Sequence, residues 1–247
     1  MAEHAVIGGT GLTNLSSLAL TGRREVTTPY GEPSGALLEG RLAGVEVIFL
    51  ARHGQGHRLP PHKINYRANL WALREEGVKN VIAINAVGGI PETLGPGRLA
   101  IPDQLIDYTW SRQHTYFDGD DGDVVHIDFS EPYSANVREV LCAASEAAGV
   151  NAASKAVYGI TQGPRLETPA EIDRLERDGC DLVGMTGMPE AALARELSLN
   201  YAACAVVANY AAGRGDGGEI TMDDIRSNLE RGMESVRQLL ALSVTMM

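Results

Sequence analysis

Two short apolar runs, each followed at once by a turn that contains glycine, constrain the fold of this chain more than any other feature. Residues 5–7 lead into Gly-Gly-Thr-Gly at 8–11, and residues 45–51 lead into Arg-His-Gly at 52–54. Such runs are typical of buried strands, and open α/β sheets bind ligands beyond the carboxyl ends of their strands. Because arginine and exposed backbone N–H groups hold oxyanions, the two turns predict an anion site at one edge of an α/β sheet.

Along the rest of the chain, apolar strand-like runs alternate with helix-like segments and turns. There is neither an internal repeat nor a low-complexity linker. Residues 111–128 are polar and rich in aspartate and glycine, which predicts a long exposed loop. Apolar runs predict further strands at 81–84, 156–161, 182–185 and 201–208. Helical spacing and capping residues predict helices at 66–76, 136–148, 169–178, 190–197 and from Thr221 onward. Residues 1–247 are therefore expected to form a single α/β domain.

Composition excludes several classes of function. The formal net charge of -11 argues against nucleic acid, whose phosphates require a basic surface. No basic leader or long apolar stretch is present, so we expect neither a signal peptide nor contact with a membrane. Cys142, Cys180 and Cys204 are widely spaced and show no metal-binding or disulfide pattern, which indicates buried thiols and a cytoplasmic location. No metal site is expected.

A dinucleotide-binding domain is the first alternative for the glycine-rich turn. Its fingerprint needs a third glycine at position 14, three residues after Gly11, and Asn14 stands there. The fingerprint therefore fails.

A histidine phosphatase or phosphoglycerate mutase is the second alternative, because those enzymes begin with a strand followed by Arg-His-Gly. Their chemistry needs a second histidine from the later half of the chain. No histidine follows His126, so this alternative is disfavoured.

Several motifs, in order and with preserved spacing, point elsewhere. They are Thr-Pro-Tyr-Gly-Glu-Pro-Ser at 28–34, Leu-Ala-Arg-His-Gly at 50–54 with Asn-Tyr-Arg-Ala-Asn at 65–69, Gly-Pro-Arg at 163–165, and Gly-Met-Thr at 184–186 with Pro-Glu at 189–190. Over most of its length the chain resembles the trimeric purine nucleoside and methylthioadenosine phosphorylases. The resemblance implies a central mixed β-sheet flanked by helices, as in nucleoside phosphorylases and hydrolases.

The resemblance also implies a reaction, phosphorolysis of an N-glycosidic bond with inorganic phosphate as co-substrate. Bound phosphate would attack the anomeric carbon as positive charge builds on the sugar. Neither a metal nor an organic cofactor is required. Asn85 stands where many relatives carry threonine, and its amide can still donate. The implied phosphate-binding residues are Thr10, Arg52, His53, Asn85, Ala86 and Thr186.

The base is expected to lie against Glu167 and Asn209, which with His53 form the implied catalytic set. An ionised carboxylate only accepts hydrogen bonds, so Glu167 suits the N1–H of a 6-oxopurine, and the amide of Asn209 can donate to O6 or N7. Methylthioadenosine phosphorylases carry serine at the position of Glu167 and aspartates at the positions of Asn209 and Ala211. Leu166 stands where an aromatic ring usually packs on the base.

The sugar side is expected to be apolar. Met185 would pack on the ribose, and Met222 and Ile225, three residues apart on one helical face, would receive a 5′-methylthio group. A neighbouring subunit of a homotrimer would contribute His126, and His57 completes the implied substrate-binding set. Together these residues predict a 6-oxopurine 5′-methylthionucleoside as substrate. A 6-aminopurine methylthionucleoside, or plain inosine and guanosine, remain open alternatives.

Overall fold

The computed structural model describes residues 2–12, 15–119, 124–217 and 221–247, apart from the side chain of Met222. The described strands form one mixed sheet of ten strands, in the order β2-β3-β4-β1-β5-β9-β8-β7, with β10 paired to β5 and β6 paired to β10. The expected α/β architecture is confirmed. The strands are β1 (His4–Gly8), β2 (Ala19–Arg24), β3 (Leu37–Leu42), β4 (Val45–Ala51), β5 (Asn80–Gly89), β6 (Leu99–Ala100), β7 (Gln104–Asp107), β8 (Val157–Ile160), β9 (Leu182–Gly184) and β10 (Asn200–Tyr210).

Strand β5 connects the two halves of the sheet. Its first part pairs in parallel with β1, its last two residues pair antiparallel with β9, and β10 runs parallel along its whole length. The sequence predicted a strand only at 81–84, because residues 85–89 read as a turn. The ladder nevertheless continues to Gly89, where a Cβ atom would lie 1.8 Å from the carbonyl oxygen of Leu94. The small residues therefore serve close packing inside a strand.

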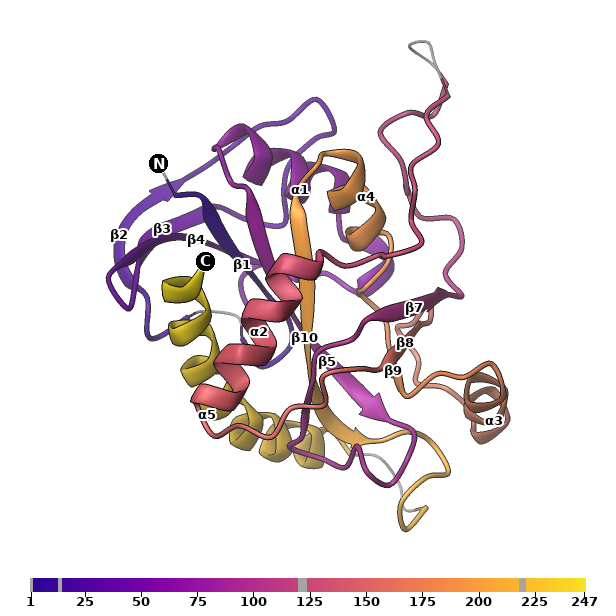
Figure 1. Cartoon of the computed structure of the whole chain (residues 1–247). Coiled ribbons are helices and arrows are strands. Elements are labelled where there is room, and N and C mark those ends of the chain that lie inside the picture. Colours follow the sequence, from indigo (N-terminus) through magenta and orange to yellow (C-terminus); the bar gives the residue numbers. More distant parts are fainter. Residues whose placement is uncertain (1, 13–14, 120–123, 218–220) are drawn as a thin grey trace.

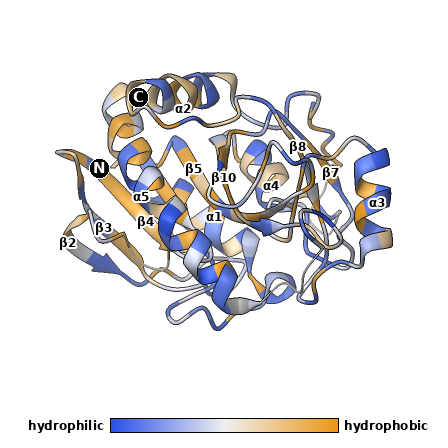
Figure 2. Cartoon of the chain, turned by 90° about the horizontal axis from the view of Figure 1, so that it is seen from below, coloured by the Kyte–Doolittle hydropathy of each residue, from blue (hydrophilic) through white to orange (hydrophobic). Residues whose placement is uncertain are grey.

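Two helical layers enclose the central strands (Figures 1 and 2). Helices α2 (Ala135–Ala147) and α5 (Met222–Met246) cover one face, and α1 (Tyr66–Glu75) and α4 (Glu190–Glu196) cover the other. Alternate residues of a strand point to opposite faces of the sheet. Ile82 and Cys204 therefore pack in the core beneath α2 and α5, whereas Ala83 and Ala203 pack in the core beneath α1 and α4. Figure 2 shows apolar strands between helices whose outer surfaces are polar.

The predicted helices are confirmed, and their first turns follow from their capping residues. Thr168 begins α3 (Pro169–Arg177) with a full capping box, and Pro169 occupies the first helical position. The hydroxyl of Thr221 accepts from the backbone N–H of Asp224 and begins α5. Helix α3 packs beside β8 and β9 through Ile172 and other buried residues. A short 3-10 helix, η1, spans Pro61–Lys63.

Four of the described strands, β2, β3, β6 and β7, were not predicted from the sequence, and β3 was missed although Leu37 and Leu42 are buried. All but one of the residues of β2 are exposed, so no apolar pattern marks it, and β6 has two residues. Between β7 and α2, the described residues contain neither helix nor strand, as expected for 111–128. None of the described helices combines the length and the apolar character needed to cross a bilayer.

Candidate active site

A cavity of about 400 Å³ opens beyond the carboxyl ends of β1, β4, β5, β9 and β10. This is the edge that the two glycine-containing turns predicted. Most of the predicted site residues line it: Thr10, His53, His57, Ala86, Leu166, Glu167, Met185, Thr186, Asn209, Ala211 and Ile225.

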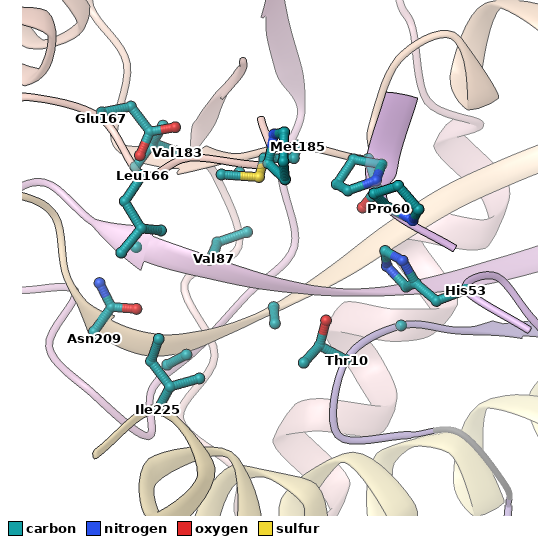
Figure 3. Close-up of a pocket in the computed structure, with 18 of the residues that line it drawn as sticks. Thr10, His53, Pro60, Val87, Leu166, Glu167, Val183, Met185, Asn209 and Ile225 are labelled. Atoms are coloured by element: carbon teal, nitrogen blue, oxygen red, sulfur yellow. The ribbon is translucent and has the colours of Figure 1, made fainter. Parts of the chain in front are cut away.

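The cavity has two ends (Figure 3). Thr10 and His53 lie at one end, which we call the phosphate end after their predicted role; Ala86 and Thr186, predicted for the same role, also line the cavity. Leu166, Glu167 and Asn209 lie at the other, which we call the base end; Met185 and Val87 lie between them. The separation matches a ligand with an anion at one side and a planar group at the other.

His53 presents one defined ring nitrogen to the phosphate end. Its Nδ1 lies 2.8 Å from the carbonyl oxygen of Leu59, which can only accept, so Nδ1 carries the proton and Nε2 has a free lone pair. Burial lowers the pKa of His53 to about 4, and the nearby charge of Arg52 and the His57 ring, 4.1 Å away between centroids, act in the same direction. A neutral His53 can therefore accept a hydrogen bond from an anion that carries a proton.

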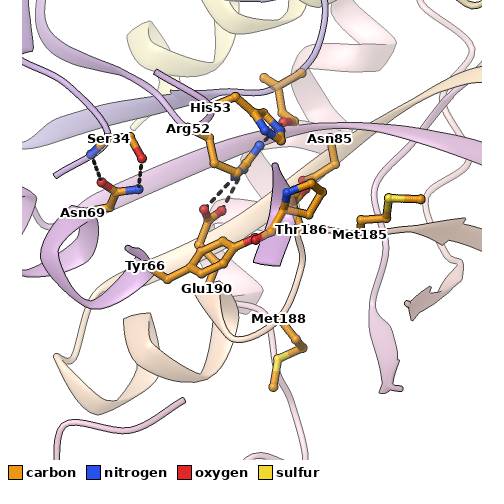
Figure 4. A network of polar contacts seen from close by, with 12 residues as sticks. Ser34, Arg52, His53, Tyr66, Asn69, Asn85, Met185, Thr186, Met188 and Glu190 are labelled. Carbon is orange, nitrogen blue, oxygen red and sulfur yellow. Dashed lines mark hydrogen bonds and ion pairs between the residues drawn. The ribbon is translucent and has the colours of Figure 1, made fainter. Parts of the chain in front are cut away.

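Arg52 does not line the cavity. Its side chain is fully buried, and Nε and Nη2 each donate to a carboxylate oxygen of Glu190 at 2.7 Å (Figure 4). Nη1 donates to the carbonyl oxygen of Ile84 at 2.8 Å, and the hydroxyl of Tyr201 donates to Glu190 at 2.8 Å. Glu190 of α4 thus occupies the Nε and Nη2 fork, while Nη1 and Nη2 each keep a second N–H, so the predicted contact of Arg52 with phosphate stays a prediction. Arg52 joins β4 to α4 behind the cavity.

The Arg52 guanidinium lies directly beneath the glycine-rich turn. A Cβ atom on Gly9 would lie 2.9 Å from Arg52 Nη1 and 2.4 Å from the carbonyl oxygen of Ile84. Only glycine allows the turn to pack this closely. The turn that carries Thr10 is thus held against β5 by a close backbone approach.

Asn85 also lies behind the cavity wall and not on it. Its side chain is fully buried, and Nδ2 donates to Thr186 Oγ1 at 2.9 Å. Thr186 therefore uses its oxygen as an acceptor in this hydrogen bond, which leaves its own proton to be donated elsewhere. The predicted contact of Asn85 with phosphate is replaced by orientation of Thr186. Asn85 Oδ1 is buried and has no hydrogen-bond partner among the described residues.

At the base end, Glu167 is a half-buried carboxyl group on the loop before α3. Burial raises its pKa, while a hydrogen bond from Thr161 Oγ1 to Oε1, 2.5 Å long, acts in the opposite direction. The amide of Asn209 donates to the carbonyl oxygen of Tyr210 at 2.7 Å. Val183 and Ala211 supply apolar walls, and Leu166 is 44% exposed at the mouth.

Two further predicted residues, Met222 and His126, are not among the described residues that line the cavity. Ile225, at the start of α5, is buried and lines the cavity, but the side chain of Met222 lies outside the described residues, so their pairing stays a prediction. His126 is exposed on the connection between β7 and α2 and does not line the cavity of its own chain. Figure 1 shows this connection extending away from the body of the molecule.

A model of the phosphorylase superfamily matches residues 3–245. The chain belongs to this superfamily. Among its relatives, a probable S-methyl-5′-thioinosine phosphorylase of Pseudomonas syringae pv. tomato is 56% identical over 241 residues, which cover 98% of each chain. A 6-oxopurine nucleoside phosphorylase of Pyrococcus furiosus is 42% identical over 99% of this chain and 92% of its own.

Solved structures of the superfamily share the fold. Methylthioadenosine phosphorylase from Schistosoma mansoni in complex with adenine superimposes with a TM-score of 0.96 at 31% identity, over 100% of this chain and 92% of its own. The resemblance inferred from the motifs is thereby confirmed.

Sequence reasoning missed two residues that shape the superfamily site. Arg112, which no motif indicated, is buried and donates to the carbonyl oxygens of Gln162, Met185 and Met188. Thr161 was read only as the end of a strand. Hydroxyl groups that follow strands at this sheet edge were the available signal, as Thr10 and Thr186 illustrate.

Proposed function

We propose that this phosphorylase cleaves S-methyl-5′-thioinosine with inorganic phosphate, giving hypoxanthine and 5-methylthioribose 1-phosphate, as a pentosyltransferase of purine salvage. The observation that carries the proposal is one cavity with the Thr10 and His53 side chains at one end and the Glu167 carboxyl group at the other. The relatives named for this nucleoside and for 6-oxopurine nucleosides support the choice of base. A 6-aminopurine methylthionucleoside and plain inosine or guanosine are the alternatives.

Phosphate would bind at the end formed by the turn after β1 and the segment after β4. The hydroxyl groups of Thr10 and Thr186 would donate to it, and backbone N–H groups near Ala86 would complete the cradle. Monohydrogen phosphate carries one proton, which can be donated to the lone pair of His53 Nε2. The anion would thus be oriented toward the anomeric carbon at the middle of the cavity, where Met185 lies.

The base would leave toward Glu167 and Asn209. As the glycosidic bond lengthens, the purine gathers negative charge, which an amide donor at O6 or N7 stabilises. An ionised Glu167 accepts from N1–H of hypoxanthine, a hydrogen that adenine lacks. The reaction as proposed uses neither a metal nor an organic cofactor, so activity should persist in a chelator.

Base release should be measured side by side with S-methyl-5′-thioinosine, S-methyl-5′-thioadenosine and inosine, with and without phosphate. We expect phosphate-dependent release that is fastest, as kcat/KM, with the first. Preference for S-methyl-5′-thioadenosine would overturn the base assignment. No phosphate-dependent release from any of the three would overturn the proposal as a whole.

We also propose a homotrimer in which a neighbouring subunit supplies His126. In support, four of the seven exposed large hydrophobic side chains in the described residues, Trp110, Phe117, Val124 and Val125, lie on the connection that carries His126. Native mass spectrometry tests the assembly. Mixing His126→Ala subunits with Asn209→Ala subunits, each expected to have little activity alone, should restore part of the activity if sites are shared.

The proposed compartment is the cytoplasm. The thiols of Cys180 and Cys204 are buried and free, and that of Cys142 is partly buried and free, as expected in a reducing compartment. Fractionation of the native host would test this location.

A further inference from the structure

The protonation of Glu167 decides which purine the base end accepts. An ionised carboxylate accepts from the N1–H of a 6-oxopurine, whereas a protonated carboxyl group can donate to the bare N1 of a 6-aminopurine. A structural feature that keeps Glu167 an acceptor therefore discriminates between the two classes of nucleoside.

Thr161 lies outside the cavity, where its hydroxyl can keep Glu167 a hydrogen-bond acceptor. Its Oγ1 lies 2.5 Å from Glu167 Oε1, and its only other hydrogen-bond acceptor among the described groups, the carbonyl oxygen of Gly184, is 3.3 Å away. The single hydroxyl proton therefore goes to Oε1 when Glu167 is ionised. Oε2 is then the oxygen left to meet a bound base. Thr161 is absent from the cavity lining and so does not touch the nucleoside.

Thr161 is itself held rigidly. Its backbone N–H donates to the carbonyl oxygen of Gly184 at 2.8 Å, which ties it to β9. The buried guanidinium of Arg112 donates to the carbonyl oxygens of Thr161 and Gln162 at 3.3 and 2.8 Å, and to that of Met185 at 2.8 Å. The hydroxyl is thus fixed by two neighbouring segments of backbone.

The charged groups around Glu167 do not replace this hydrogen bond. Arg165, on the same loop, lowers the pKa of Glu167, and Glu171, on α3, raises it. These two groups form a bidentate ion pair with each other at 2.7 and 2.8 Å, so their effects on Glu167 largely cancel. Burial, the largest influence, favours the protonated form, and the Thr161 hydroxyl is the strongest group that opposes it.

We propose that Thr161 is a specificity-determining residue, whose hydroxyl holds Glu167 as a hydrogen-bond acceptor and thereby sets the preference for 6-oxopurine over 6-aminopurine nucleosides. The proposal rests on the proposed function in that Glu167 must face the base. Thr161 is a positioning residue, because it acts through Glu167.

The test compares wild type, Thr161→Val and Thr161→Ser. Valine keeps the shape of threonine without the hydroxyl, and serine keeps the hydroxyl. For each protein, kcat/KM is measured for S-methyl-5′-thioinosine and S-methyl-5′-thioadenosine between pH 5 and 9. The ratio of the two values at one pH is the readout, because the titration of phosphate and of His53 affects both substrates alike and cancels.

Thr161→Val should lower this ratio about tenfold or more, since a hydrogen bond to a charged group is lost. The acid limb of the methylthioinosine profile should move to higher pH, while methylthioadenosine cleavage should rise toward low pH. Thr161→Ser should have the kcat/KM ratio and the pH profiles of wild type. In a Glu167→Ala background, Thr161→Val should leave the ratio unchanged, because the group through which it acts is gone.

Equal losses for both nucleosides with an unmoved pH profile would overturn the proposal and reduce Thr161 to a structural role. If Thr161→Val does not fold, Thr161→Ala provides the same comparison. Failure of the proposed function looks different: wild type itself would then release no base from either nucleoside in a phosphate-dependent way.

Discussion

The two ends of the cavity are built differently. At the phosphate end, Asn85 is hydrogen-bonded to Thr186, and His53 is hydrogen-bonded to a backbone carbonyl. The Arg52–Glu190 ion pair lies fully buried behind them. At the base end, Glu167 and Leu166 lie on a loop, and Leu166 is 44% exposed. The phosphate end is thus supported by a hydrogen-bonded network behind the cavity, whereas the base end combines Asn209 of β10 with the loop residues Leu166 and Glu167. Substitutions at the first end should damage the enzyme, and substitutions at the second should change its selectivity.

The largest effect is expected from Glu190→Ala, which leaves the Arg52 guanidinium buried without its partner. Breaking such a pair costs about 3–5 kcal/mol of unfolding free energy. Urea denaturation followed by circular dichroism measures it. Arg165→Ala, which breaks an exposed pair with Glu171, is the matched control and should change stability far less. Equal stabilities for the two variants would contradict the assignment.

His53→Ala should come next. Loss of one group that binds the reacting anion lowers kcat/KM for phosphate by about 10² to 10³. The ratio between methylthioinosine and methylthioadenosine should stay as in wild type, because the base end is untouched. A changed ratio would show that the two ends are not independent.

The same residue should shape the acid limb of stability. Because the pKa of His53 is lowered from 6.5 to about 4, the unfolded chain takes up this proton first. Its contribution is complete above pH 6.5 and is lost as the pH falls toward 4. Tm measured across this range should therefore fall less steeply in His53→Ala than in wild type.

A third comparison concerns the 5′ substituent near Ile225. Burying an unpaired 5′-hydroxyl costs about 1–3 kcal/mol, and the lost methylthio contact about 1 kcal/mol more, which predicts on the order of 10²-fold preference for methylthioinosine over inosine. Ile225→Asn should narrow this gap in kcat/KM. Equal values in wild type would indicate a polar or hydrated pocket.

Asn85→Ala should have a smaller effect, since it only frees the Thr186 hydroxyl to rotate. Loss of one neutral hydrogen bond predicts about a two- to tenfold rise in KM for phosphate. Asn69→Ala is the control: Asn69 is equally buried, but it bonds Ser34 and lies away from the cavity. A rise in the KM for phosphate with Asn69→Ala as well would point to a general loosening of the fold.

The smallest effect is expected from Leu166→Phe at the base end. An aromatic ring stacked on the purine contributes about 1 kcal/mol, so KM for the nucleoside should fall a few-fold. The KM for phosphate should not change. A loss of affinity would mean that Leu166 does not lie over the base.

Local patterns predicted the parts of this molecule that depend on neighbouring residues. The apolar run 45–51 gave β4 with its observed bounds, and Thr168 with Pro169 gave the start of α3. The strand-end rule brought Thr10, His53 and Thr186 to one cavity. Exposed β2 carries no comparable pattern and was missed.

Partners far apart in the chain were not predictable in this way. Arg52 and Glu190 are 138 residues apart, so nothing near Arg52 indicates that its fork is occupied. Arg112 lies in a loop, and its acceptors are backbone carbonyls, which every residue possesses. Asn85 was expected to touch phosphate because many relatives carry threonine at this position, whereas in the structure it is its neighbour Ala86 that lines the cavity.

Strand β5 sets the distance between the two ends of the cavity. Ala86 lines the cavity beside the predicted phosphate cradle, and Gly88 lines it two residues further along, where β9 and β10 bring in the apolar walls of the base end. At about 3.3 Å per residue, the strand spaces these positions by about 7 Å. The span is set by backbone pitch and not by any side chain. Loops around this strand can be exchanged to alter selectivity, whereas inserting one residue into β5 would change the distance between the two ends of the cavity.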